Sequence, residues 1–274
     1  MSARPSTRSV TKAAVFTHNR HDETRETIEQ LRDLAQQRGV ELLTQDDEGA
    51  RKQADVCIVL GGDGATLRAM RAYAGTSVPV FSINFGRVGF LATVDQDDTR
   101  EALELALTGR FEVVQMPALV LDEGSPEMFA INEVSFLRRS HLNMAHITYY
   151  LAGQVIARVP CDGLLAATPV GSTGYNLSVG GPILSWGVSA FVVSLVAAHA
   201  LSARGLVASP TDLLEVVNEG PEPLDIVFDG IRLGELAVGA RSNVRFRPDV
   251  VGLAQLPGES FYRRFREKLM QLSR

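Results

Sequence analysis

The residues best suited to chemistry begin at Gly61-Gly62-Asp63-Gly64, directly after the apolar run Val56–Leu60. Glycines at such a strand-to-helix turn let backbone N–H groups approach an anion, and a helix N-terminus adds a partial positive charge. A carboxylate beside a phosphate cradle is repulsive unless it accepts a proton or meets a metal, and a general base for a substrate hydroxyl meets that condition. The alternative is a tight turn in which Asp63 only N-caps the following helix.

A second glycine-containing turn, Asn84-Phe85-Gly86-Arg87-Val88-Gly89-Phe90, follows the next apolar run. Its two glycines flank Arg87, whose guanidinium suits a phosphate contact, although an exposed loop arginine would have the same pattern. Phe90 is by residue type a core side chain rather than one that stacks on a base.

Asn132-Glu133 places an amide beside a carboxylate at the start of a predicted strand. Asparagine supplies a hydrogen-bond donor and an acceptor and glutamate supplies two acceptors, so the pair can recognise an adenine edge and ribose hydroxyls. An ordinary strand start would look the same.

A long segment, Gly163–Ala203, contains no Asp, Glu, Lys or Arg. Proline and glycine interrupt it, and no apolar run approaches the roughly 20 residues that a membrane span requires. Within it, Thr168–Pro182 combines small hydroxyls, glycines and Tyr175. This composition suits a neutral purine or nicotinamide held by backbone and hydroxyl groups. A structural glycine-rich loop is the alternative.

The elements that must position these residues fall into two sets. Before residue 113, strand and helix signals alternate, which predicts a parallel sheet covered by helices, with ligands at the C-terminal ends of its strands. Residues 113–257 contain short β-branched or alternating runs separated by turn residues, which predicts a β-rich, sandwich-like domain. Residues 258–274 place Phe261, Phe265, Leu269 and Leu272 on one helical face. We expect that helix to pack on its own protein rather than on a membrane.

Composition narrows the class of protein. The 274 residues include 27 Lys and Arg against 32 Asp and Glu, a net charge of −5, which disfavours nucleic-acid binding. Cys57 and Cys161 are too few for a disulfide framework or a zinc cluster, so we expect a reducing cytoplasm. Met1–Lys12 has no apolar core and is not a secretory signal.

Taken together, these motifs resemble the NAD kinase family. The Gly-Gly-Asp-Gly block alone is weak, because diacylglycerol-kinase-like and phosphofructokinase-like enzymes share it, but its combination with the glycine- and hydroxyl-rich block is highly specific. The matching blocks stand in the family's order: Gly61–Gly64, Asn84–Phe90, Asn132-Glu133, Asp162-Gly163, Thr168–Pro182, His199–Arg204 and Phe228-Asp229-Gly230.

The resemblance implies transfer of the terminal phosphoryl group of ATP, or of polyphosphate, to the 2′-hydroxyl of the adenosine ribose of NAD, giving NADP. It implies Asp63 as the proton acceptor and Mg²⁺ or another divalent cation held largely by phosphates and water, with no protein metal cage. Gly61, Gly62 and Arg87 are then expected to hold the phosphate donor. The expected dinucleotide contacts are Asp63, Gly64, Arg68, Phe90, Asn132, Glu133, His146, Asp162, Thr173, Gly174, Tyr175, Asn176 and Ser178.

The same resemblance implies an α/β domain (1–112), a β-rich NAD-binding domain (113–257) and a C-terminal helix (258–274) that returns to the first domain. It also implies a homodimer or homotetramer that binds no membrane.

Three departures from the family pattern bear on activity. Ala65 and Val170 stand where the family usually has threonine, and we expect the neighbouring Thr66 to compensate if the turn shifts. Pro160-Cys161 replaces a segment in which some members carry an arginine linked to preference for NAD over NADH. Two other functions stay open: a lipid kinase of the diacylglycerol type, and a non-catalytic dinucleotide sensor.

Overall fold

A computed structural model describes residues 4–5, 9–17, 21–43, 53–86, 89–95, 99–122, 128–139, 143–200 and 204–272. The chain forms two compact units: unit 1 contains residues 1–115 and 250–274, and unit 2 contains residues 116–249. Two strands, β7 (Glu112–Leu121) and β17 (Arg241–Gln255), have residues in both units.

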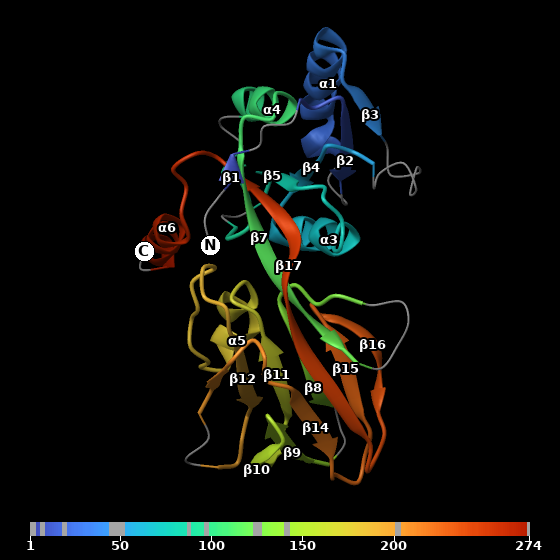
Figure 1. The fold of residues 1–274 in the computed structure, drawn as a ribbon, viewed down its shortest axis with the longest axis vertical. Coiled ribbons are helices and arrows are strands. Elements are labelled where there is room, and N and C mark those ends of the chain that lie inside the picture. The colour runs from blue at the N-terminus through green and yellow to red at the C-terminus, as the bar shows by residue number, and fades with distance from the viewer. Residues whose placement is uncertain are drawn as a thin grey trace. The chain divides into compact units, whose positions relative to one another are not determined.

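Unit 1 is built on a parallel sheet in the order β3-β2-β4-β5, extended at β5 by β6 and by the end of β17. The helices α1 and α4 lie on one side of these strands and α3 lies on the other (Figure 1). The elements are β1 (Arg4–Pro5), β2 (Lys12–Thr17), α1 (His21–Arg38), β3 (Glu41–Leu43), β4 (Val56–Gly61), α3 (Asp63–Ala72), β5 (Val80–Asn84), β6 (Val94–Asp95), α4 (Thr99–Leu107) and α6 (Phe261–Leu272).

The sequence explains this arrangement. Every residue of β4 and β5 is buried, as the continuous apolar runs predict for central parallel strands covered on both faces. Leu31, Leu34 and Ala35 of α1 pack into the core with Ala102 and Leu103 of α4. Both helices are followed by a glycine in the left-handed region, where a Cβ would be strained (φ +67° at Gly39 and at Gly109).

Unit 2 contains two antiparallel groups of strands. One has the order β13-β12-β11-β8-β15-β16, and the other joins β10, β9, β14 and the first part of β17. The elements are β8 (Glu133–Arg138), β9 (Ala145–Leu151), β10 (Gln154–Cys161), β11 (Gly163–Ala167), the 3₁₀ turn η2 (Gly171–Thr173), α5 (Tyr175–Ser178), β12 (Phe191–Val196), β13 (Leu206–Ala208), β14 (Leu214–Asn218), β15 (Leu224–Phe228) and β16 (Ile231–Leu236).

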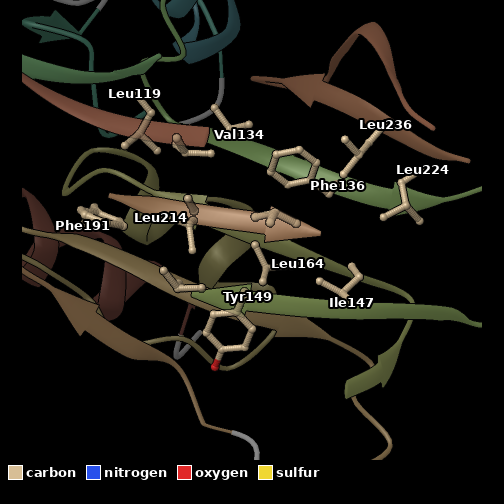
Figure 2. Packing of buried hydrophobic residues seen from close by; sticks show 14 of the residues in the cluster. Leu119, Val134, Phe136, Ile147, Tyr149, Leu164, Phe191, Leu214, Leu224 and Leu236 are labelled. Carbon is tan, nitrogen blue, oxygen red and sulfur yellow. The ribbon is translucent and has the colours of Figure 1, made fainter. Parts of the chain in front are cut away.

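The two groups pack face to face and share one core. Phe136 of β8, Leu164 of β11 and Phe191 of β12 meet Tyr149 of β9 and Leu214 of β14, so apolar side chains of both sheets fill the space between them (Figure 2). This packing is that of a β-sandwich and confirms the predicted fold class.

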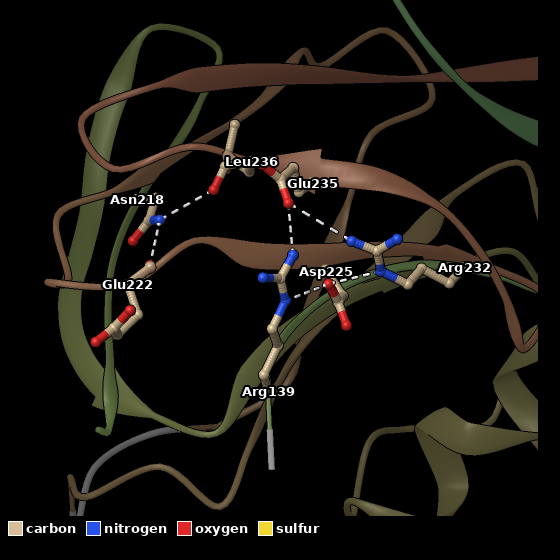
Figure 3. Close-up of polar contacts among 7 residues, drawn as sticks. All are labelled: Arg139, Asn218, Glu222, Asp225, Arg232, Glu235 and Leu236. Carbon is tan, nitrogen blue, oxygen red and sulfur yellow. Dashed lines mark hydrogen bonds and ion pairs between the residues drawn. The ribbon is translucent and has the colours of Figure 1, made fainter. Parts of the chain in front are cut away.

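Polar contacts tie the ends of this sandwich together (Figure 3). Asn218, at the end of β14, donates to the carbonyl oxygens of Glu222 (2.8 Å) and Leu236 (3.1 Å), which joins one sheet to the other. Asp225 of β15 and Glu235 of β16 alternate with two arginines, Arg139 directly after β8 and Arg232 of β16, in a network of four ion pairs. Every charge in that network has a protein partner.

The units differ from the predicted domain boundaries at both ends of the second domain. Residues 113–115, near the start of β7, lie in unit 1, and so do residues 250–257, although we predicted both segments to belong to the β-rich domain. For residues 250–257 the reason is that Leu253 of β17 pairs in parallel with Val80 of β5, so the strand ends inside the first sheet. Helix α6 also lies in unit 1, and it spans the predicted residues Phe261–Leu272.

Candidate active site

Asp63 is the first residue of α3, and Gly62 is the N-cap. The Asp63 carboxylate does not cap its own helix, so the N-cap alternative is wrong. Instead it accepts hydrogen bonds from the backbone N–H groups of Phe90 (2.7 Å) and Leu91 (3.0 Å), 27 and 28 residues further along the chain. Two N–H donors fix the orientation of a half-buried carboxylate at the C-terminal end of the parallel sheet.

The two glycine turns lie against one another because their strands are neighbours. Gly61 pairs with Asn84 in the β4–β5 register, and Phe85 donates its N–H to the Gly61 oxygen (3.2 Å). A Cβ on Gly86 would lie 3.5 Å from the Gly62 Cα, which is ordinary contact, but a Cβ on Gly89 would overlap the Asp63 carboxylate. Gly89 is therefore required for the carboxylate to reach the N–H groups beyond it.

The remaining predicted residues of this region have different environments. Gly64 is exposed, and Arg68 is half-buried on α3 with its Nε enclosed and without a hydrogen-bond partner among the described residues. Arg87 lies outside the described residues. Thr66 is fully buried, and its hydroxyl contacts the Gly62 oxygen (3.2 Å) and the Ser82 hydroxyl (2.6 Å). Thr66 thus faces the interior and does not replace the hydroxyl that is absent at Ala65.

In unit 2, the backbone of Asn132 and Glu133 is held by a carboxylate from a distant hairpin. Asp229 accepts hydrogen bonds from the N–H groups of Ile131 (3.0 Å), Asn132 (2.7 Å) and Glu133 (3.1 Å). Asp229 and Gly230 form the two-residue turn between β15 and β16, with φ of +46° and +79°. Such a turn favours Asp-Gly because both residues must adopt positive φ.

The side chains of Asn132 and Glu133 carry the signs of a binding site. Asn132 Oδ1 and Glu133 Oε2 are both buried without a hydrogen-bond partner among the described residues. A Cβ added to Gly174 would lie 3.6 Å from Glu133 Oε2 and 3.7 Å from Asn132 Nδ2, so the pair faces this turn. Burial, and secondarily the charge of Asp229, raise the pKa of Glu133 to about 7. Buried polar atoms are normally paired, so these two oxygens indicate a ligand.

The hydroxyl-rich segment is divided between structural and outward-facing residues. Ser172 and Asn176 are fully buried, and Asn176 donates to the oxygens of Ser172 and Pro182 (both 3.0 Å) and accepts from Ser194 (2.8 Å). The Asn176 amide is therefore occupied by the protein itself. Thr173 and Tyr175 are half-buried and Ser178 is exposed, and the Thr173 hydroxyl donates to the Val170 oxygen (3.2 Å).

Asp162 and Tyr175 belong to the same neighbourhood as Glu133. Arg138 donates to Asp162 at 2.5 Å, and this hydrogen bond lowers the pKa of the Asp162 carboxyl. Burial first, and then the charges of Asp162 and Glu133, raise the pKa of Tyr175. His146 is different: it is exposed on β9, in the other sheet of the sandwich, and no contact described for the chain joins it to Asn132 or Glu133.

Sequence reasoning missed the residues that build the site without belonging to its motifs. Arg138 and Leu91 carry no distinctive pattern, and only the fold shows that they contact Asp162 and Asp63. Asp229 stood within a recognised block but had no role assigned to it. Its signal was the Asp-Gly turn between two predicted strands, which exposes a carboxylate at a hairpin end.

The described residues contain no group of three or more His, Cys, Asp or Glu side chains able to hold a metal ion. In the same part of the chain, no helix is long and apolar enough to cross a membrane.

Comparison with known proteins gives consistent matches in both units. Residues 6–111 match the family model of the ATP-NAD kinase N-terminal domain, and residues 131–248 match that of the ATP-NAD kinase C-terminal domain. A NAD kinase of Rhodopirellula baltica is 38% identical over 224 residues, covering 80% of this chain and 72% of the relative. A NAD kinase of Gemmatimonas aurantiaca is 34% identical over 252 residues, covering 88% and 83%.

Two solved structures share the fold. Yeast NADH kinase complexed with NADH superimposes with a TM-score of 0.84 at 21% identity, covering 96% of this chain and 88% of that one. An NAD kinase from Archaeoglobus fulgidus in complex with ATP gives 0.79 at 24% identity, covering 94% and 98%. At these identities the likeness establishes the architecture.

Proposed function

Since this chain belongs to the NAD kinase family and converts NAD to NADP, we propose that Asp63 accepts the proton of the 2′-hydroxyl of the adenosine ribose while ATP supplies the phosphoryl group. One observation carries the assignment of Asp63. Its carboxylate stands at the C-terminal end of the parallel sheet, held by the N–H groups of Phe90 and Leu91. Ligands of parallel α/β sheets bind at this end.

The reaction needs little covalent participation by the protein. The ribose O2′ loses its proton to Asp63 and forms a bond to the γ-phosphorus, while the bond from that phosphorus to the β,γ-bridging oxygen breaks and ADP leaves. Positioning and electrostatic stabilisation dominate such a transfer. The proposed cradle for the phosphates is the turn Gly61–Gly64, because it leads into the N-terminus of α3, where backbone N–H groups and the helix dipole favour an anion. The N–H groups of Ala65 and Thr66, further into the helix, already donate to the Gly62 oxygen (3.0 and 3.1 Å).

We propose that Mg²⁺ accompanies the phosphate donor. Mg²⁺ is usually held by one or two protein groups together with substrate phosphates and water, so we assign most of its ligands to the phosphate oxygens of ATP and to water. When bound, the ion would neutralise charge on the transferring phosphoryl group.

Recognition of NAD is assigned to unit 2. The buried, unpartnered oxygens of Asn132 and Glu133 support binding of a nucleotide edge or ribose hydroxyl, and Asp162, Thr173 and Tyr175 surround the same turn. Ser178 is exposed and Gly174 adjoins Glu133, which supports their inclusion. Asn176 contributes by fixing the loop, since its amide is already occupied.

The test compares two aspartates that are held in the same way. Asp63→Asn should lower kcat by at least ~100-fold and leave NAD affinity largely intact, because the amide cannot take the hydroxyl proton. Asp55 is the matched control: its carboxylate accepts from the N–H groups of Thr11 (2.7 Å) and Lys12 (3.0 Å), where β2 begins. Asp55→Asn should keep kcat near normal. Near-normal NADP formation by Asp63→Asn would remove Asp63 from the proposed role.

A further inference from the structure

Arg264 of α6 is a buried arginine that the assigned chemistry does not use. It is 7% exposed, and its guanidinium donates through Nη1 to the carbonyl oxygens of Phe90 (3.1 Å) and Ala92. Glu259 lies 3.9 Å from its Nε. A buried guanidinium needs hydrogen bonds to compensate for the hydration it loses, and here two of them go to carbonyl oxygens of one short segment.

The segment that Arg264 contacts is the one that holds Asp63. The carbonyl of Phe90 and the N–H of Leu91 belong to one peptide group. Arg264 donates to the carbonyl oxygen of that peptide group. The N–H of the same group, which is that of Leu91, donates to Asp63 Oδ1 at 3.0 Å. The N–H of Phe90 donates to Asp63 Oδ2 at 2.7 Å. A single peptide group thus stands between a guanidinium and the carboxylate.

We propose that Arg264 is a positioning residue for Asp63, acting through the Phe90–Leu91 peptide. Hydrogen bonds in a chain polarise one another, so a cation on the carbonyl side strengthens the N–H as a donor to the carboxylate. The second contact, to the Ala92 oxygen, fixes the orientation of the backbone from Phe90 to Ala92, since one planar guanidinium donates to both carbonyls. This inference rests on the proposed role of Asp63 as the base.

The helix itself supplies a fixed platform for this contact. Phe261 is buried and stacks on Phe265 with ring centroids 5.8 Å apart, and the Arg264 N–H donates to the Ser260 oxygen (3.2 Å). All of these residues belong to unit 1, as Asp63 and Phe90 do. A C-terminal helix would therefore serve catalysis at a loop more than 170 residues earlier in the chain.

The variant Arg264→Met keeps the length of the side chain and removes its donors. We expect kcat to fall about tenfold with the KM for NAD little changed, the size expected for one charge-assisted hydrogen bond. Amide hydrogen exchange at Leu91, measured by NMR, should accelerate. Arg264→Lys, which keeps one charged donor, should recover part of both. The matched control is Arg266→Met, because Arg266 is an exposed arginine of the same helix.

A double variant separates this role from a general loss of structure. If Arg264 acts through Asp63, adding Arg264→Met to Asp63→Asn should leave kcat at the value of Asp63→Asn alone. Multiplied losses in the double variant, or unchanged kcat and unchanged Leu91 exchange in Arg264→Met, would overturn the proposal. If Arg264→Met does not fold, Arg264→Lys and Arg264→Gln serve in the same comparison. Failure of the base assignment would show separately, as activity retained in Asp63→Asn.

Discussion

Replacing Glu133 with glutamine should remove a pH dependence from the stability of unit 2. Glu133 is only 7% exposed, and burial followed by the charge of Asp229 raises the pKa of its carboxyl from 4.5 to about 7. In the unfolded chain the pKa returns to its ordinary value. Between these two values the folded protein keeps a proton that the unfolded chain releases, so the free energy of unfolding falls as pH rises through this window.

The size of the effect follows from the two pKa values. A group that titrates at 4.5 unfolded and about 7 folded contributes roughly 2–3 kcal/mol less stability at about pH 8 than at about pH 5. Glutamine has nearly the same shape and does not titrate. The difference in stability between Glu133→Gln and the parent should therefore shift by that amount, in favour of the variant, as pH rises.

The assay is urea unfolding followed by the fluorescence of Trp186, the single tryptophan of the chain, which is buried within unit 2. Other titrating groups are common to both proteins and cancel in the difference. Glu222→Gln is the control, since it removes a carboxylate from the same unit outside this cluster. Parallel stability profiles for the parent and Glu133→Gln from about pH 5 to about pH 8 would refute the argument.

Two further substitutions test the construction of the site. Gly89→Ala should lower kcat roughly 10- to 100-fold, because the added Cβ would displace the Asp63 carboxylate. Gly234→Ala is the control, since a Cβ there has no atom within 4 Å, and it should leave kcat unchanged. Equal turnover of the two variants in a steady-state NADP assay would contradict this. Asn176→Ala should destabilise unit 2 by about 2–3 kcal/mol in the Trp186 assay, since it leaves the oxygens of Ser172 and Pro182 without this donor. Ser178→Ala should leave the stability unchanged, because Ser178 is exposed. Equal urea midpoints for the two variants would contradict the structural role of Asn176.

The sequence predicted best what local pattern determines. A helix at Phe261–Leu272 and a strand at Val56–Leu60 depend on short segments, and the structure confirms both. The strands β11 and β12 were not predicted as strands, although both lie inside the charge-free segment. They are inner strands of their sheet, and most of their residues are buried on both faces. The alternation that marks a half-exposed strand is therefore missing.

The site was predictable in its motifs but not in the direction its side chains face. Composition alone cannot distinguish a hydroxyl that binds a ligand from one that closes a loop. The hydroxyls of Thr168, Ser172 and Thr173 all donate to backbone oxygens, but Thr168 and Ser172 are fully buried whereas Thr173 is half-buried in the same segment. Only the packing of Pro169–Leu184 on itself separates the two groups.

Each unit uses a carboxylate in the same structural way. Asp63 accepts the N–H groups of Phe90 and Leu91 in unit 1, and Asp229 accepts those of Ile131 to Glu133 in unit 2. In both cases the carboxylate comes from one motif and the N–H groups from another, so neither motif is complete alone. Both carboxylates are half-buried, and they differ in their proposed roles: Asp63 acts on the substrate, while Asp229 orders the backbone of Asn132 and Glu133. A motif residue in this fold can therefore act by fixing the backbone of another motif, as Asp229 does for Asn132 and Glu133.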